Sequence, residues 1–475
     1  MKKSFKYLFM LMIGCGVFVG CSDEDLDPTL QQSKDIDISV NTQNDLNAII
    51  NGAYNRMSLT DYYGRDYIIL GEVFSDNTAS NANSNRFVAE ARMDLLPTSG
   101  VVETLWSRLY SVIGSANIVI NSEGITGDQA AIDQIKGEAY VIRALAHFNL
   151  VQFYGQQNVN NGGLSAAGVP YVTAFRDDTA LFPGRNTVQE VRDMAYADLD
   201  MAKSLMGASA PVEYFSTYAA SAIEARIANY FGDWQRSLDA AKTVIDSGQF
   251  SVVSEDAFLS TFSSDGGTNS IFEIAASDID NEGINGLANI YQQGAYGDVV
   301  VLPNLAAIYD EGDVRGVSEY DPSTDYEAET VIGVDANGTL RNIGKYPSTA
   351  PYDDNIPVIR YEEVVLIYAE ALLETSGDDS GDALDWLNMI PENRGAMSYD
   401  SASKDNVLLE RRKELAFEGF RFHDLARTMM DIPNPDPVLQ THEGPAYGSF
   451  NFALPIPAAE VDANSNIPQN AGYGE

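Results

Sequence analysis

Cysteine, histidine, tryptophan and positive charge are all scarce in this chain, and each shortage excludes a class of function. Its 475 residues include two Cys and three His. Cys15 lies inside an apolar N-terminal run, so Cys21 has no pairing partner in the mature chain and neither a disulfide framework nor thiol catalysis is expected. His147, His423 and His442 stand far apart in the sequence, and without further Cys they do not predict a zinc site.

Positive charge is the largest shortage. Lys and Arg number 29 against 69 Asp and Glu, which gives a formal net charge of −40. A surface of this sign repels phosphate backbones, so a nucleic-acid partner is not expected. Anionic substrates are disfavoured as well, unless a local basic pocket offsets the surrounding acid. Most of the acid is interpreted as solvated surface.

Long apolar runs are missing too, apart from residues 7–19. Three Lys precede this run, a Gly and Cys21 follow it, and acidic residues 23–25 come next. Because the run is shorter than the roughly 20 residues that cross a bilayer, residues 1–20 are predicted to be a cleaved signal peptide. The residues before Cys21 resemble the lipobox of bacterial lipoproteins, which implies that Cys21 becomes the acylated first residue. An ordinary signal peptide with an incidental Cys is the alternative.

The rest of the chain divides into a tether and a body. Residues 21–40 are polar and acidic without a helical period, so they are predicted to form a flexible tether behind Cys21. Residues 41–475 are predicted to form a single body. Two of its stretches, about 60–100 and 249–357, are rich in Gly, Asn, Asp, Ser and Tyr and lack helical patterns. Long loops of this kind are usually functional, so a ligand is expected to bind there.

Helical patterns dominate the remainder of the body. Helices are predicted from Thr42 onward, over 101–120, and over 129–154, which is apolar nearly all round and therefore buried. Thr187 and Glu190 form a capping box at the start of another helix.

Two helix pairs are predicted over residues 215–248 and 360–390. The first pair is joined through Gly232-Asp-Trp234 and is rich in small residues. A small-residue helix, such a turn and a second Ala-rich helix resemble a tetratricopeptide repeat. Several repeats stacked together would build a helical scaffold.

Five sequence blocks in a fixed order carry a resemblance to a known family. The blocks cover residues 136–155, 168–171, 356–371, 410–427 and 454–473. The most specific is 410–427, E-R-R-K-E-L-A-F-E-G-F-R-F-H-D-L-A-R. Together with the lipobox, these blocks resemble the SusD/RagB family of nutrient-binding lipoproteins. His423 and Ala471 depart from the residues that are frequent at those places.

The resemblance implies both a fold and a function. The fold would be mostly α-helical, with a tetratricopeptide-like helical-repeat scaffold packed against an irregular, loop-rich half. The protein would be lipid-anchored in the outer membrane and face the cell exterior, and residues 22–25, Ser-Asp-Glu-Asp, look like the signal for that face. It would capture oligosaccharides and deliver them to a SusC-like TonB-dependent transporter, with no enzymatic activity and no cofactor.

Sugar binding requires aromatic rings that stack on pyranose faces and polar groups that bond the hydroxyls. Trp106, Trp234 and Trp386 fall within helical or repeat-turn patterns and are assigned to the core, so the platform is expected from loop aromatics. The candidate aromatic residues are Tyr62, Tyr63, Phe87, Tyr291, Tyr296 and Tyr352. The candidate polar partners are Arg65, Asp76, Asn77, Asn81, Asn83 and Arg86.

Two other functions stay open on the sequence alone. The first is capture of a peptide or protein in a groove of the helical repeats. The second is a surface glycoside hydrolase with an Asp/Glu pair. The acids and bases of the third and fourth blocks are placed at helical spacing, which favours mutual ion pairs over a catalytic pair. They are Glu362, Glu363, Glu370, Arg411, Arg412, Glu414, Glu418, Arg421 and Asp424.

One segment starts like a calcium-binding loop. Residues 278–283 carry acids at alternate positions and a Gly, but Asn289 stands where such loops use a bidentate Glu. The segment is therefore interpreted as an acidic turn, and a structural calcium elsewhere among the acids stays open.

Overall fold

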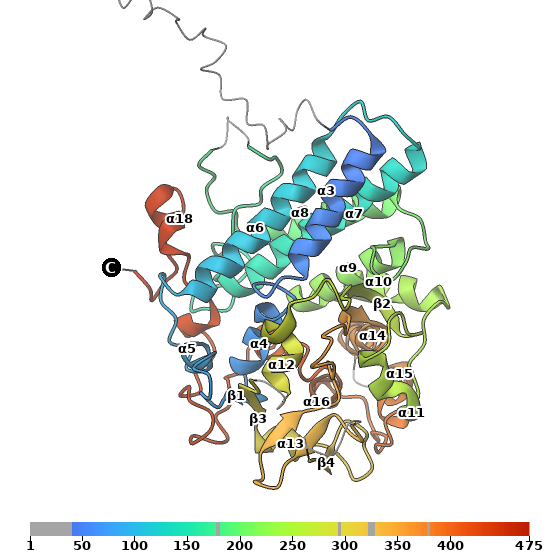
Figure 1. Cartoon of the computed structure of the whole chain (residues 1–475), viewed down its shortest axis with the longest axis vertical. Helices are drawn as coiled ribbons and strands as arrows, with labels where there is room; N and C mark the ends of the chain where they lie inside the picture. The colour runs from blue at the N-terminus through green and yellow to red at the C-terminus, as the bar shows by residue number, and fades with distance from the viewer. Residues whose placement is uncertain (1–39, 177–180, 293–295, 322–327, 378–380, 475) are drawn as a thin grey trace, which may run out of the picture. The chain divides into compact units, whose positions relative to one another are not determined.

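The computed structural model describes residues 40–474 except for 177–180, 293–295, 322–327 and 378–380 (Figure 1). The predicted signal peptide, Cys21 and nearly all of the predicted tether lie outside these described residues. Thr42–Glu475 forms one compact unit. No helix in the described part of the chain is both long and apolar enough to cross a membrane.

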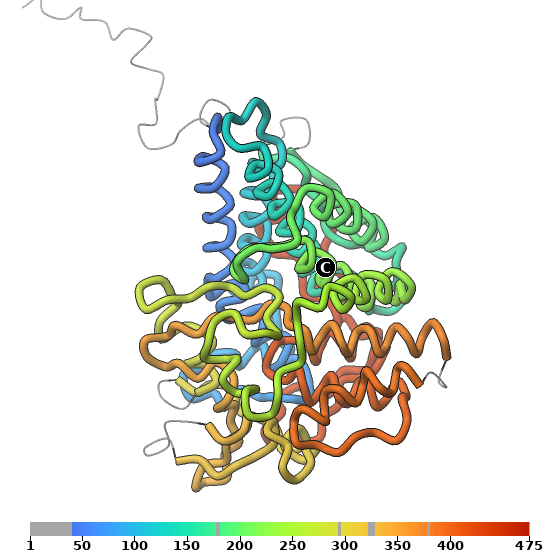
Figure 2. Tube along the Cα trace, turned by 90° about the vertical axis from the view of Figure 1, so that its right-hand side faces the viewer, coloured from blue at the N-terminus to red at the C-terminus, as the bar shows by residue number. Residues whose placement is uncertain are grey.

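The long helices pack one on another in chain order. They are α3 (Gln43–Met57), α6 (Gly100–Asn121), α7 (Gln129–Tyr154), α8 (Val188–Leu205), α9 (Thr217–Phe231), α10 (Trp234–Asp246), α14 (Tyr361–Ser376), α15 (Gly381–Glu392) and α16 (Lys404–Glu414). Each of α6 to α9 packs on the next, α10 packs on α14, and α14 packs on α15 and α16. Figure 2 shows the later helices, from α8 to α16, stacked one below another. The mostly α-helical fold predicted from the sequence is confirmed.

Local sequence signals explain where these helices begin and end. The Thr187 hydroxyl accepts the amide of Glu190 at 3.2 Å, and the Glu190 carboxylate accepts the amide of Thr187 at 2.7 Å, which confirms the capping box. Helix α7 is buried on nearly all sides, as predicted. Helix α9 ends at Gly232, whose φ of 70° is a left-handed conformation that favours glycine, and α10 begins at Trp234.

The loop-rich half consists of short elements. The short helices are α4 (Asp66–Val73), α5 (Val88–Ala91), α11 (Glu255–Phe258), η2 (Leu259–Phe262), η3 (Gly283–Asn285), α12 (Leu287–Tyr291), α13 (Pro303–Ala306), α17 (Arg421–Arg427), η4 (Phe450–Phe452) and α18 (Ala458–Ala463). The strands are β1 (Thr78–Ser80), β2 (Ser270–Ile274), β3 (Val299–Val301), β4 (Val317–Glu319), β5 (Ile332–Val334), β6 (Leu340–Asn342) and β7 (Ile356–Arg360). Antiparallel pairs form between β1 and β3, β2 and β7, and β5 and β6, while β4 and β5 are parallel.

Helix α4 corrects the prediction that residues 60–100 contain no helix. All eight of its residues are buried, so it shows no amphipathic pattern by which a helix is recognised in a sequence.

The block at 410–427, whose charged residues stand at helical spacing, does not form one continuous helix. Helix α16 ends at Glu414 and α17 begins at Arg421, because Phe417 and Gly419 between them have left-handed φ angles of 72° and 84°. The charged side chains are buried in ion pairs, as predicted, but most of their partners lie on other elements. Glu414 pairs with Arg315, Arg360 and Arg394.

Candidate functional site

The loop between β1 and α5 has an unusual backbone. Ala82, Asn85 and Phe87 have left-handed φ angles of 60°, 63° and 56°, and Met93 follows with 53°. Non-glycine residues rarely adopt this conformation, and such strained positions cluster at ligand-binding sites. The backbone therefore marks this loop as a candidate site.

Hydrogen bonds from a distant segment hold the loop in this shape. The Asn81 side-chain amide donates to the Gly297 carbonyl at 2.7 Å. The amide and hydroxyl of Ser84 donate to the carboxylate of Asp298 at 3.1 and 2.7 Å, and that carboxylate is fully buried. Because Ser80 of β1 pairs with Val299 of β3, the two segments meet in a fixed register.

Two arginines lie against aromatic rings beside this loop. The Arg86 guanidinium lies 3.7 Å from the centre of the Tyr296 ring, and the Arg65 guanidinium lies 5.6 Å from the Phe87 ring. Asn285 connects the two, because its side-chain oxygen accepts a hydrogen bond from Arg86 at 3.1 Å and its carbonyl accepts one from Arg65 at 3.2 Å. Four predicted candidates from distant parts of the sequence therefore come together, although contact with a ligand stays a prediction.

Arg65, Arg86 and Phe87 line an open pocket of about 480 Å³, which we call the loop pocket. Its polar lining consists of Arg65, Asp66, Asn85, Arg86, Glu90, Arg92 and Asp94. The volume falls within the roughly 300–1,000 Å³ of small-molecule sites. Guanidinium, carboxylate and amide groups can bond sugar hydroxyls as donors and acceptors.

Two carboxyl groups, the buried Asp66 and the half-buried Glu90, give the loop pocket its electrostatic character. Burial raises the pKa of Asp66, although Arg65, at 2.6 Å, lowers it. Burial also raises the pKa of Glu90, and the nearby negative charge of Asp66 adds to the rise. Sequence reasoning missed Asp66, Asn85, Glu90, Arg92 and Asp94 of the lining, and Asn285 beside it. The Asn-rich run at 81–86 was a signal for Asn85, whereas the others had none.

The structure corrects five other candidates, because it places them in the core. Tyr62 and Tyr63 are buried and donate to the Asn149 side-chain oxygen at 2.7 and 3.0 Å. Tyr291 is also buried and donates to the Phe417 carbonyl at 3.2 Å.

The buried polar candidates are held by partners on other segments. Asp76 pairs with Arg412 and Arg421, and the Asn77 amide donates to Glu72 at 3.1 Å. Without exposed surface, the five corrected side chains do not reach a ligand in this conformation. Phe87 is also buried, although it lines the loop pocket.

The remaining candidates lie at the surface. Asn83 is exposed at the tip of the loop. Tyr352 is half-buried and lines a separate cavity of about 50 Å³ that also contains Asp354, and burial raises the pKa of Asp354 to about 7.

All three tryptophans were predicted to lie in the core, but the structure places them in different environments. Trp106 is buried and packs edge-on against Tyr154 with ring centres 5.0 Å apart, which confirms its core assignment. Trp386 is half-buried against Tyr368 at 5.2 Å. Trp234 is half-buried and lines an open groove of about 880 Å³, so its assignment to the core is wrong.

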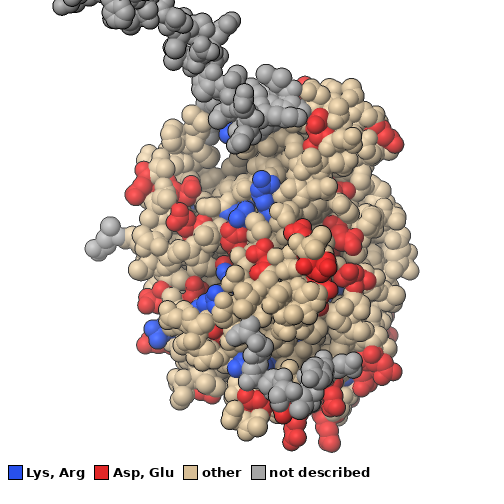
Figure 3. Space-filling view, in the orientation of Figure 1, with Lys and Arg blue, Asp and Glu red and all other residues tan. Residues whose placement is uncertain are grey.

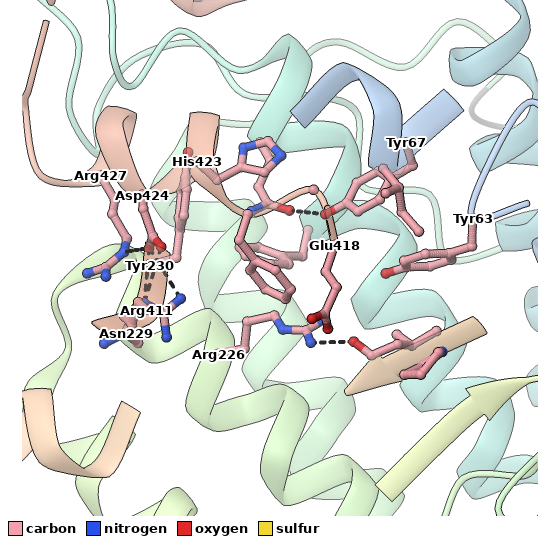
Figure 4. A pocket seen from close by; sticks show the side chains of 17 residues that line it. Tyr63, Tyr67, Arg226, Asn229, Tyr230, Arg411, Glu418, His423, Asp424 and Arg427 are labelled. Carbon is pink, nitrogen blue, oxygen red and sulfur yellow. Dashed lines mark hydrogen bonds and ion pairs between the residues drawn. The ribbon is translucent and has the colours of Figure 1, made fainter. Parts of the chain in front are cut away.

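A further cavity lies at the junction of α4, α9, α16 and α17 (Figure 4). It has a volume of about 30 Å³, enough for a water molecule but far too small for a sugar. His423 borders it, and burial lowers the pKa of this imidazole to about 3, so it is neutral at physiological pH. The cavity is therefore part of the polar core.

Charge on the surface agrees with the composition. On the face shown in Figure 3, acidic side chains are spread widely whereas basic ones gather in a few places. Among the residues described, no group of three or more His, Cys, Asp or Glu side chains is arranged to hold a metal ion.

Comparisons with known proteins cover nearly the whole chain. Residues 25–228 match a family model described as starch-binding and associating with the outer membrane, and residues 311–473 match the model of the SusD family. SusD-like protein P2 of Formosa agariphila is 26% identical over 538 residues, which cover 99% of this chain and 100% of that protein. Starch-binding protein SusD of Bacteroides thetaiotaomicron is 30% identical over 138 residues, which cover 28% of this chain and 24% of that protein. A SusD superfamily crystal structure from Bacteroides vulgatus matches with a TM-score of 0.81 and 27% identity, covering 92% of this chain and 100% of that one.

Proposed function

This chain belongs to the SusD/RagB family, and we propose that it captures uncharged oligosaccharides at the cell surface without cleaving them. The family description as starch-binding supports a carbohydrate ligand. The observation that carries the proposal is the loop pocket, where guanidinium, amide and carboxylate groups converge in about 480 Å³. The large negative charge disfavours an acidic glycan.

Capture is the first step of uptake in this proposal. The protein is anchored through an acylated Cys21 in the outer membrane and faces the exterior. It delivers its ligand to a SusC-like TonB-dependent transporter. The lipobox-like sequence before Cys21 and the family description, which includes association with the outer membrane, support this arrangement.

The motif acids support binding without hydrolysis. Glu414, Glu418 and Glu362 are buried and paired with Arg or Lys. They therefore have neither the access nor the free carboxylate that a glycosidase requires.

A glycoside hydrolase is the second candidate, and one observation favours it. Glu90 and Asp66 share the loop pocket, and both have raised pKa values. A carboxylic acid with a raised pKa beside a second carboxyl group is the arrangement of a glycosidase. However, Asp66 is 4% exposed and paired with Arg65 at 2.6 Å, which leaves it unsuited to attack a sugar.

Titration of the full-length protein with maltohexaose and cellohexaose tests the proposal. We expect binding of at least one hexasaccharide by calorimetry, with no reducing ends released over hours. Arg86→Ala should weaken binding about ten- to a hundredfold, because a hydrogen bond to a charged group contributes about 1.5–3 kcal/mol.

Arg192→Ala is the matched control, since Arg192 also lies over a tyrosine ring but outside the loop pocket. Its affinity should equal that of the wild type. Release of reducing ends that Glu90→Gln abolishes would establish the hydrolase instead. Binding that Arg86→Ala leaves intact would remove the loop pocket from the proposal.

A further inference from the structure

The groove at Trp234 is built by segments that are far apart in the sequence. It is bordered by the loop 157–164 after α7, the turn between α9 and α10, the start of α16, residues 427–430 at the end of α17, and residues 447–448. Its volume of about 880 Å³ is larger than that of the loop pocket, and no residue lines both. The groove is therefore a separate cavity.

The lining of the groove combines rings with amides. The aromatic residues are Tyr230, Phe231, Trp234 and Tyr447. The amide residues are Gln157, Asn158, Asn160, Asn161 and Asn229. Aromatic rings stack on the apolar faces of pyranoses, while amides both donate to and accept from hydroxyls. This combination is typical of carbohydrate sites.

Tyr230, a lining residue that is only 7% exposed, accepts hydrogen bonds from two amides of the groove. The side-chain amides of Gln157 and Asn158 both donate to the Tyr230 hydroxyl at 3.0 Å. Burial raises the pKa of Tyr230 to about 12, although the two amides lower it, so the hydroxyl keeps its proton at neutral pH. Since a phenol has one donor, that proton remains for another acceptor.

The groove is close to neutral, although the chain carries a net charge of −40. Its two basic side chains are already paired: Lys404 and Arg427 contact the buried Glu370 at 2.8 and 2.7 Å. Asp405 is the single acidic side chain in the lining. Neither an anionic nor a strongly cationic ligand would gain from this balance, which favours an uncharged one.

The rim exposes an apolar side chain in a strained conformation. Met429 is 70% exposed and has a φ of 59°, and Asn161, also in the lining, has a φ of 61°. Left-handed non-glycine residues store strain that the surrounding structure must offset, and they cluster at binding sites.

We propose that this groove is a second binding site for an uncharged oligosaccharide, in which Trp234 supplies the stacking surface. The inference rests on the proposed function, because it assumes that the protein binds glycans. Lys404 lies 4.5 Å from the Trp234 ring and covers one face, so a ligand uses the opposite face or displaces this side chain. Two sites on one chain would hold a long glycan more tightly than either site alone.

The test is the stoichiometry of maltohexaose and cellohexaose binding to the full-length protein, measured by calorimetry. We expect two bound molecules per chain for the wild type and one for Trp234→Ala. Met429→Lys, which changes an exposed rim residue and leaves the core intact, should also reduce the stoichiometry to one. Trp386→Ala is the matched control and should bind two, since Trp386 is half-buried outside the groove.

The Arg86→Ala variant separates the two proposals. If the wild type, Trp234→Ala and Met429→Lys each bind one molecule and Arg86→Ala binds none at the same concentrations, the groove is not a glycan site and the proposed function stands. If Trp234→Ala abolishes all binding while Arg86→Ala changes nothing, the groove is the site and the loop pocket is not. Failure of the wild type to bind either hexasaccharide overturns both proposals.

Discussion

At the scale of single residues, Glu72 is a buried acid that makes stability depend on pH. Its carboxylate is fully buried, and burial raises its pKa from 4.5 to about 7, although the Asn77 and Gly419 amides lower it. The folded state therefore binds its proton more tightly than the unfolded state, and this group makes stability fall as pH rises from 4.5 to about 7. In Glu72→Gln this loss should disappear.

Between about pH 5 and about pH 8, the free energy of unfolding of Glu72→Gln should consequently rise relative to that of the wild type by on the order of 1–3 kcal/mol. Urea unfolding at both pH values measures the change. Glu392→Gln, at an exposed position, is the control and should change stability equally at both. An equal effect of Glu72→Gln at both pH values would contradict the prediction.

Residue types in the loops indicated part of the loop pocket, but exposure could not be read from them. Arg65, Arg86 and Phe87 line the loop pocket, and their contact with a ligand stays a prediction. Tyr62 has the same local sequence character, yet it is buried because its hydroxyl meets Asn149, 87 residues away. Whether a loop aromatic is covered depends on such distant partners.

At the scale of elements, the helical spacing of the block at 410–427 indicated ion pairs but not their partners. A spacing of three to four residues is satisfied equally by contacts along a helix and by contacts to neighbouring elements. The break at Phe417 and Gly419 turns the two halves apart. As a result, α16 meets β7 through Glu414 and Arg360, which are 2.6 Å apart.

Glu414 is the centre of this contact between elements. Burial alone would raise its pKa, but Arg394, Arg360 and Arg315 outweigh burial and hold the pKa well below its ordinary value. Glu414→Gln leaves these guanidinium groups undercompensated in the core, which should cost about 3–5 kcal/mol of unfolding free energy.

Glu374→Gln provides the matched comparison, because Glu374 is exposed and pairs with Lys404 at the surface. Its cost should be about 0–1 kcal/mol. Denaturant unfolding of both variants measures the difference. Similar costs would mean that the buried network contributes no more than a surface pair.

At the scale of the whole molecule, the long helices were predictable because their hydrophobic periods are long. Helices α6 and α7 lie within one residue of their predicted bounds at each end. The groove at Trp234 was not predictable, because it exists only where five segments meet. Helical periodicity is the same for an aromatic ring that a neighbouring element covers and for one that lies beside a cavity.

Attachment of the whole molecule to the membrane is predicted to depend on one atom, the sulfur of Cys21. The lipobox-like residues before Cys21 make acylation of this sulfur the attachment that the sequence offers. Several acyl chains hold a protein stably on a membrane, whereas a protein without an acyl chain keeps only weak contacts with it. Cys21→Ser should therefore move the protein from the outer-membrane fraction to a soluble one, measured by fractionation and immunoblotting.

Cys15→Ser, within the predicted signal peptide, is the control and should remain in the membrane. Retention of Cys21→Ser in the outer membrane would mean that another segment or partner provides the anchor.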